Sequence, residues 1–162
     1  MYILERRTGT PLPTVDAPPG ITIRPWYLET DSEKERFIET HRLVFPRHPY
    51  SIPKLEQLAS QPGWCNFTAW HQDAVAGNIM VFTRQDASER IGVIEDLFVL
   101  ENYRRKGIGR VLLQAALVYL LSVDLQTIRL EMWSTNQLAF KLYQSYGFKV
   151  VAQTELAVGR FV

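Results

Sequence analysis

Apolar residues recur along the chain at two spacings, which separate predicted helices from predicted strands. Over residues 31–45 they repeat at helical spacing until Pro46, which predicts an amphipathic helix. A second, short helix is expected at about residues 53–60. Residues 66–71 and 75–83 have the composition of strands and are separated by a turn, which predicts an antiparallel hairpin.

The second half of the chain has a strand, helix, strand order. Residues 91–99 are strand-like, residues 107–122 form an apolar helix with a narrow polar stripe, and residues 126–133 are strand-like again. A crossover of this length makes the two strands parallel and puts the loop before the helix where open α/β sheets bind ligands. The rest of the chain is expected to form one helix and two short strands, at residues 134–146, 148–152 and 157–162.

Length and composition fit one globular domain. The chain has 162 residues, 46% of them hydrophobic, and no low-complexity tract marks a boundary. We therefore expect a single domain over residues 1–162. Four prolines lie in residues 8–20, so residues 1–20 are expected to form an irregular arm, with the first strand near residues 21–24.

The remaining composition excludes several classes of protein. A single cysteine, Cys65, excludes an intramolecular disulfide, and three scattered histidines do not form a metal-binding pattern, so no metal is expected. No apolar stretch approaches the roughly 20 residues that cross a bilayer. The N-terminus also lacks the apolar segment of a signal peptide. We expect a soluble, cytoplasmic protein with no membrane partner.

The loop before the apolar helix has the features of an anion site. Its glycines, Gly107 and Gly109, let the backbone approach a ligand, and the helix start presents unpaired N–H groups. It also concentrates basic residues in a chain that has 18 of them against 17 acidic ones, namely Arg104, Arg105, Lys106 and Arg110. Such local charge favours a small polyanion over nucleic acid, and phosphate is the usual ligand of such a loop. A solvated turn that caps the helix is the alternative.

Three blocks in the right order resemble the GNAT superfamily of N-acetyltransferases. Arg104-x-x-Gly107-x-Gly109 resembles its acyl-CoA pyrophosphate signature, and Ile94-Glu95-Asp96-Leu97-Phe98-Val99 resembles its central strand. Downstream, Asn136-x-x-Ala139-x-x-x-Tyr143-x-x-x-Gly147-Phe148 resembles its second conserved block. The nearest-looking pattern is that of the diamine acetyltransferases.

The resemblance implies an α/β (α+β) fold. Its sheet would be mixed and mostly antiparallel, with a central parallel strand, helix, strand unit and helices on both faces. Residues 21–90 would form the acceptor-side half and residues 91–148 the acetyl-CoA-binding core. One position departs from the signature, because Arg105 stands where relatives often have glycine.

The resemblance also implies which residues bind acetyl-CoA as co-substrate. The backbone N–H groups of residues 105–110 would hold its pyrophosphate, and a bulge in the central strand would free main-chain groups for the pantetheine arm. Asn136 would contact the pantetheine region. The implied set is Leu97, Phe98, Val99, Arg104, Arg105, Lys106, Gly107, Ile108, Gly109, Arg110, Asn136 and Ala139.

Tyr143 is the candidate general acid for the departing thiolate. Acetyl transfer to an amine needs such an acid. Asn136, Phe140 and Tyr143 lie along one face at helical spacing, so a face that meets the pantetheine would bring the Tyr143 hydroxyl toward the sulfur. The alternative is a core aromatic that packs with neighbouring apolar residues.

Glu95 is the candidate base, acting directly or through water. Period-two alternation places it on the face of Val93, Leu97 and Val99, and both faces of a central strand are normally covered. Burial there would raise its pKa toward the range of a general base. The alternative is a structural partner for a buried donor. Asp96, on the opposite face, and Glu131, on the paired strand, are weaker candidates.

The amine acceptor is not determined by the sequence. The resemblance implies that residues 26–64 build its pocket, and this region is rich in aromatic and acidic residues: Trp26, Tyr27, Phe45, His48, Tyr50 and Trp64, with Glu29, Asp31, Glu33 and Glu35. Core packing and helix-dipole complementarity explain the same residues. A small amine is favoured, with polyamines, amino-acid derivatives, antibiotics and a protein N-terminus or lysine left open.

Direct attack of the amine in a ternary complex is expected, because no histidine adjoins Cys65 in the sequence to activate its thiol. A non-catalytic acyl-CoA sensor is the rival interpretation. A nucleotide-binding P-loop is disfavoured, since the loop lacks the Gly-Lys-Ser/Thr ending. A homodimer is plausible because short C-terminal strands leave a sheet edge uncovered.

Overall fold

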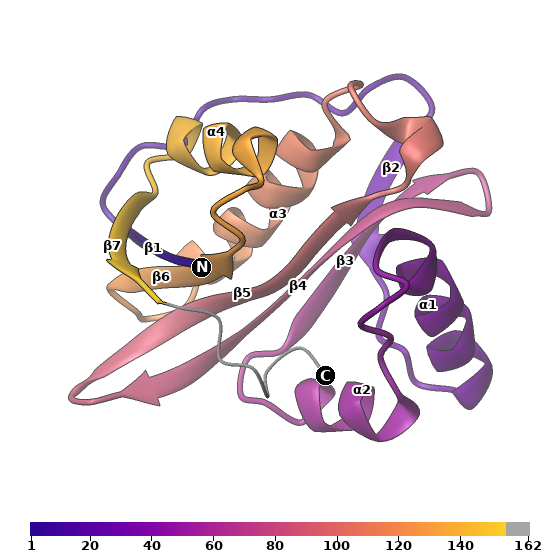
Figure 1. Cartoon of the computed structure of the whole chain (residues 1–162), viewed down its shortest axis with the longest axis horizontal. Coiled ribbons are helices and arrows are strands. Elements are labelled where there is room, and N and C mark those ends of the chain that lie inside the picture. The colour runs from indigo at the N-terminus through magenta and orange to yellow at the C-terminus, as the bar shows by residue number, and fades with distance from the viewer. Residues whose placement is uncertain (155–162) are drawn as a thin grey trace.

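A seven-stranded sheet in the order β2-β3-β4-β5-β6-β1-β7 runs through the molecule (Figure 1). The structure is a computed structural model and describes residues 1–154. Its strands are β1 (Tyr2–Arg7), β2 (Ile21–Pro25), β3 (Cys65–His71), β4 (Ala74–Asp86), β5 (Glu89–Val99), β6 (Thr127–Met132) and β7 (Lys149–Gln153). Its α-helices are α1 (Asp31–Val44), α2 (Ile52–Ala59), α3 (Ile108–Leu121) and α4 (Gln137–Ser145), with a 3-10 turn, η1, at Glu101–Tyr103.

The predicted topology is confirmed. Within the described sheet, β5 and β6 are the one parallel pair, joined by α3, and every other pairing is antiparallel. The predicted hairpin is β3 and β4. The strand expected at residues 148–152 is β7, whereas the one expected at residues 157–162 lies outside the described residues.

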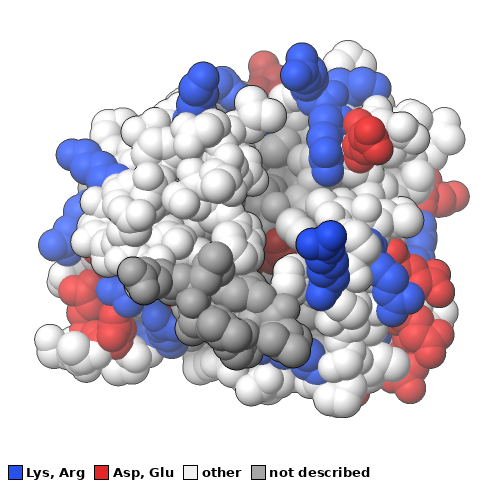
Figure 2. Space-filling view, viewed as in Figure 1, with Lys and Arg blue, Asp and Glu red and all other residues white. Residues whose placement is uncertain are grey.

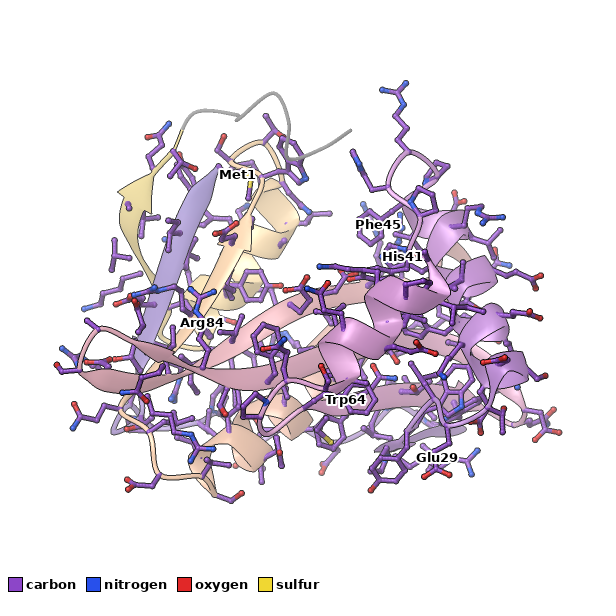
Figure 3. The ribbon with its side chains drawn as sticks, turned by 90° about the horizontal axis from the view of Figure 1, so that it is seen from below. Met1, Glu29, His41, Phe45, Trp64 and Arg84 are labelled. Carbon is purple, nitrogen blue, oxygen red and sulfur yellow. The ribbon has the colours of Figure 1, made fainter. Side chains whose placement is uncertain are left out.

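Helices cover the two faces of the sheet, as Figures 1 and 3 show, and an apolar cluster lies between the helices and the sheet on each face. On one face α3 buries a row of apolar residues, among them Leu112, Leu113 and Leu117, together with α4. On the other face α1 and α2 bury Phe37, Leu55 and neighbouring residues against β3, β4 and β5. This arrangement confirms helices on both faces.

The prediction of an irregular arm over residues 1–20 is wrong for its first residues. Residues 2–7 are not part of an irregular arm but form β1, which pairs with β6 on one side and β7 on the other. The strand was missed because one of its two inward positions is an arginine: Leu4 and Arg6 are both buried. Residues 8–20 contain no helix or strand, as expected.

Arg6 ties this arm to the end of α4. Its side chain is only 1% exposed. The guanidinium donates to the carbonyl oxygens of Tyr146 at 2.7 Å, Arg7 at 3.1 Å and Pro11 at 3.2 Å, and to that of Thr10. One buried cation therefore satisfies carbonyl groups of β1, the arm and the end of α4.

Within residues 1–154, no helix is long and apolar enough to cross a membrane. No cluster of three or more potential metal-ligating side chains is found among the same residues.

We predict that Arg6→Ala lowers the free energy of unfolding by about 2–4 kcal/mol, because it leaves several buried carbonyl groups without a donor. Chemical denaturation measures this. Arg7→Ala is the matched control, since Arg7 is the next residue of β1 but is exposed. Equal stability of the two variants would show that the Arg6 network does not hold the arm.

Candidate active site

A β-bulge in β5 is the local feature that shapes the site. On β4, Met80 pairs with Asp96 but the next residue, Val81, pairs with Ile94, so Glu95 is the extra residue of the bulge. The parallel ladder with β6 ends at the pair Ile94 and Leu130. Beyond Ile94, β5 keeps its partner β4 but has no strand partner on its other edge within the described residues.

The bulge overturns the predicted placement of the two carboxylates. An extra residue shifts the alternation of the strand by one position. Leu97 and Val99 therefore pack on the α3 side, whereas Val93 and Phe98 belong to the α1 and α2 side. Glu95 does not share a face with Leu97 and Val99, and its side chain is exposed rather than covered.

Asp96 faces α1 and is held by two donors. Its Oδ2 atom lies 2.7 Å from His41 Nε2, and the Tyr50 hydroxyl donates to the same oxygen at 3.2 Å. The rings of His41 and Tyr50 are 4.3 Å apart between centroids. Burial, followed by the charges of Asp96 and Glu95, raises the pKa of Tyr50, so this hydroxyl remains a donor. Asp96, the weaker candidate base of the sequence prediction, is thus already engaged by two side chains.

His41 was missed as a site residue. It is 3% exposed and lies on the buried face of α1 with Phe37, where helical spacing alone indicates core. Figure 3 shows His41 and Phe45 projecting together from the last turns of α1. A histidine on the apolar face of a predicted helix was the available signal, although only the fold reveals Asp96 as its partner.

A cavity of about 630 Å³ opens between α1, α2 and the bulge. Its lining residues are His41, Phe45, Arg47, His48, Pro49, Tyr50, Lys54, Glu95, Asp96 and Trp133. Figure 2 shows this face hollowed near its centre, with acidic atoms inside the hollow and basic side chains beside it. Its volume is typical of small-molecule sites.

The predicted acceptor residues divide into two groups. Phe45, His48 and Tyr50 line the cavity, as expected. The other predicted aromatics do not: Trp26 is buried in the core with Phe37, Tyr27 is exposed, and Trp64 packs at the edge of the core. The acidic residues at the start of α1 also lie outside the lining. Glu33 forms a capping box with Thr30, and Asp31 pairs with Lys34 at 3.7 Å.

The loop at the start of α3 has the backbone geometry of an anion site. Gly107 is the N-cap of α3 with a left-handed φ of 84°, and no side chain caps the helix. Among the described residues, none of the N–H groups of residues 105–110 donates a hydrogen bond to the protein. These N–H groups follow the carboxyl end of β5, where a helix dipole favours negative charge.

The basic side chains of this loop have different surroundings. Arg104 Nε donates to the carbonyl oxygen of Val99 at 2.9 Å and so ties the loop to the end of β5. Lys106 Nζ lies 5.7 Å from the centre of the Tyr103 ring. Arg105 has a φ of 62°, which explains why glycine suits this position.

Tyr143 is a core residue whose pKa is raised by burial and by the charge of Asp96. It is 7% exposed and packs with Phe148 at 5.7 Å between ring centroids, as the core alternative predicted. Burial raises its pKa, and the charge of Asp96 raises it further. The phenol therefore remains protonated at neutral pH, which is the state that a general acid needs.

Asn136 and Cys65 have clear structural roles. Asn136 is the N-cap of α4, and its Oδ1 accepts from the N–H of Ala139 at 3.1 Å. Cys65 is buried in the core, and burial raises the pKa of its thiol. A raised pKa disfavours the thiolate that a covalent acetyl intermediate requires.

Comparison with known families identifies the domain. The model of the Acetyltransferase (GNAT) family matches residues 26–148. The chain belongs to this family. The family predicted from the three sequence blocks is therefore confirmed, and the match also includes α1, α2 and the β3–β4 hairpin.

Individual relatives agree with this assignment. The chain is 26% identical over 159 residues to the mycothiol acetyltransferase of Thermobispora bispora, an alignment that covers 91% of the chain and 53% of that protein. A GCN5-related N-acetyltransferase from Sphaerobacter thermophilus has a similar structure, with a TM-score of 0.71, 21% identity, and coverage of 92% of this chain and 47% of that one. The chain spans about half the length of the mycothiol acetyltransferase that it matches.

A third similar structure contains CoA. The aminoglycoside N-acetyltransferase AAC(6')-Iy in complex with CoA has a TM-score of 0.70 and 18% identity, with coverage of 86% of this chain and 95% of that one. At this identity the likeness shows the shared fold.

We predict that Asn136→Ala lowers the free energy of unfolding by about 1 kcal/mol through loss of the α4 cap. Asn136→Asp keeps a capping oxygen and should retain the stability. If the amide also contacts pantetheine, the Asp variant should bind acetyl-CoA more weakly despite normal stability. Thermal unfolding and calorimetry separate the two roles, and wild-type behaviour of both variants would contradict both.

Proposed function

We propose that the domain transfers the acetyl group of acetyl-CoA to a small primary amine by direct attack in a ternary complex. The observation that carries this proposal is the row of unpaired N–H groups at residues 105–110. The row lies at the start of α3 and follows β5, whose residues after Ile94 are no longer paired with β6. Family membership supports the same activity.

The cofactor path follows from these features. The pyrophosphate would bind the N–H groups of residues 105–110, and the pantetheine arm would use main-chain groups of Leu97, Phe98 and Val99 on the open edge of β5. Asn136 and Ala139 lie at the start of α4, on the other side of this path in the proposed arrangement. The thioester would then reach the bulge, which borders the cavity.

Glu95 and Tyr143 have complementary roles in the proposed reaction. Glu95 lines the cavity and would take a proton from the acceptor ammonium, directly or through water. The neutral nitrogen would attack the thioester carbonyl, and a C–N bond would replace the C–S bond. Tyr143 would give its proton to the departing thiolate, and the second proton that the nitrogen loses as the amide forms would return to the Tyr143 oxygen. Asp96 is occupied by His41 and Tyr50, so its proposed role is electrostatic.

Calorimetric titration of acetyl-CoA, with ATP as the control, tests the proposed site. A panel of amines assayed for release of the CoA thiol then tests the reaction. We expect acetyl-CoA to bind more tightly than ATP and at least one amine to accelerate thiol release. Binding without turnover on any amine would favour a sensor, and no binding would refute the assignment of the loop.

We predict that Tyr143→Phe lowers kcat about 100-fold or more while the Kd of acetyl-CoA changes little, because only the acid is removed. Steady-state kinetics and calorimetry measure the two quantities. Tyr119→Phe is the matched control: its hydroxyl donates to the carbonyl oxygen of Gly63, away from the cavity. A Tyr143 variant as active as this control would exclude Tyr143 as the acid.

The raised pKa of Tyr143 predicts the alkaline side of the pH profile. The acid is active when protonated, so its contribution is lost only as pH rises through a pKa above the usual value of about 10. We expect kcat at saturating substrates to hold between about pH 8 and pH 10. A decline centred below pH 9 that is absent from Tyr143→Phe would contradict this assignment.

A further inference from the structure

We infer that the acceptor is a zwitterion: a small primary amine that also carries a carboxylate, as an amino acid does. This inference rests on the proposed function and names the substrate class of the same cavity. It departs from the polyamine and from the polycationic antibiotic, two of the classes that the sequence left open.

Opposite charges line different walls of the cavity. Glu95 and Asp96 come from the bulge of β5, whereas Arg47 comes from the α1–α2 loop and Lys54 from α2. An ammonium group directed at the carboxylates therefore leaves the rest of the same molecule near two cations. A carboxylate on that molecule would complement them.

Arg47 and Lys54 make no polar side-chain contact with the part of the chain that the structure describes. Both are exposed, and within residues 1–154 neither side chain forms a salt bridge or a hydrogen bond. Lys34, on α1, behaves differently: it pairs with Glu56 at 3.2 Å and with Asp31. The cavity thus keeps two cations available for a ligand, while the nearby lysine outside it is paired.

Among residues 1–154, Glu95 and Asp96 are the acidic side chains that line this cavity, so the described lining offers a polycation no second anionic site. The acidic residues of the α1 N-terminus do not line it. Glu33 is used in the capping box, and Asp31 pairs with Lys34. A second ammonium group would instead approach Arg47 and Lys54, and like charges would oppose its binding.

Apolar side chains complete the cavity. Phe45, Pro49 and Trp133 lie in the lining together with the charged residues. They offer contact area for the organic part of an acceptor. The combination matches an amino acid with an apolar side chain: an amine, a carboxylate and a hydrophobic group on one small molecule.

The test compares amino acids with the amines left when their carboxylate is removed, for example phenylalanine with phenethylamine, and ornithine with putrescine. Binding of each to the CoA-saturated protein is measured by calorimetry, and kcat/KM with acetyl-CoA is measured by thiol release. We expect the amino acid of a preferred pair to bind about tenfold more tightly or better. In the double variant Arg47→Gln, Lys54→Gln this preference should disappear.

Arg42→Gln is the matched control. Arg42 is an exposed arginine of α1 that does not line the cavity, so its loss should leave the preference intact. Circular dichroism of the double variant checks that it is folded. A preference that survives in the folded double variant would overturn the inference.

The two proposals fail in different ways. Turnover that is equal or faster for the decarboxylated amines would overturn the zwitterion inference and leave the acetyltransferase activity in place. Selective binding of amino acids without any thiol release would support the inference and refute the proposed activity. Failure of every amino acid to bind the CoA-saturated protein would overturn the inference.

Discussion

The extra residue at Glu95 is the constraint on which the site depends. β4 remains paired with β5 on both sides of the bulge. On the other edge of β5, pairing with β6 stops at Ile94, directly before the extra residue. A regular strand would have continued to pair with β6 and closed this edge. It would also have turned Glu95 and Asp96 to opposite faces of the sheet. The bulge therefore opens the edge of the sheet and brings both carboxylates to one cavity.

The loop after β5 is coupled to the same strand. Arg104 donates to the carbonyl oxygen of Val99, and Leu100 N–H donates to the carbonyl oxygen of Ala76 on β4. These bonds fix the strand end from which the chain turns into α3. The unpaired N–H groups of the helix start are thus held at a set distance from the bulge. Rigid placement of this kind reduces the ordering cost of ligand binding.

Periodicity and motif spacing predicted most of the fold. The hairpin, the parallel unit and both amphipathic helices of the first half follow from where apolar residues recur. β1 does not, because a buried arginine occupies an inward position that an apolar residue would have marked. Arg6 is tolerated there because carbonyl oxygens surround its guanidinium: three come from the nearby residues Arg7, Thr10 and Pro11, and one from the distant Tyr146.

The site was less predictable than the fold for a related reason. The glycine loop, Tyr143 and the acidic strand are visible as local patterns, but the position of a bulge has no reliable signature in a single strand. Alternation therefore placed Glu95 on the face of Leu97 and Val99, where the structure does not have it. His41 and Asp96 are 55 residues apart, and their 2.7 Å contact arises from the packing of α1 on β5. Such a pair belongs to the tertiary structure and not to either segment alone.

Two neighbouring carboxylates in one cavity are suited to different tasks because their surroundings differ. Asp96 accepts from His41 and Tyr50. Burial raises the pKa of Tyr50 and of Tyr143, and the charge of Asp96 raises both further, so the two phenols stay protonated on the two sides of the strand. Glu95 is exposed to the cavity and is placed to meet an incoming ammonium. In the proposed reaction, one bulged strand would therefore provide both the base, Glu95, and the fixed charge of Asp96, which adds to the raised pKa of the proposed acid. The two adjacent carboxylates would then not compete for one role.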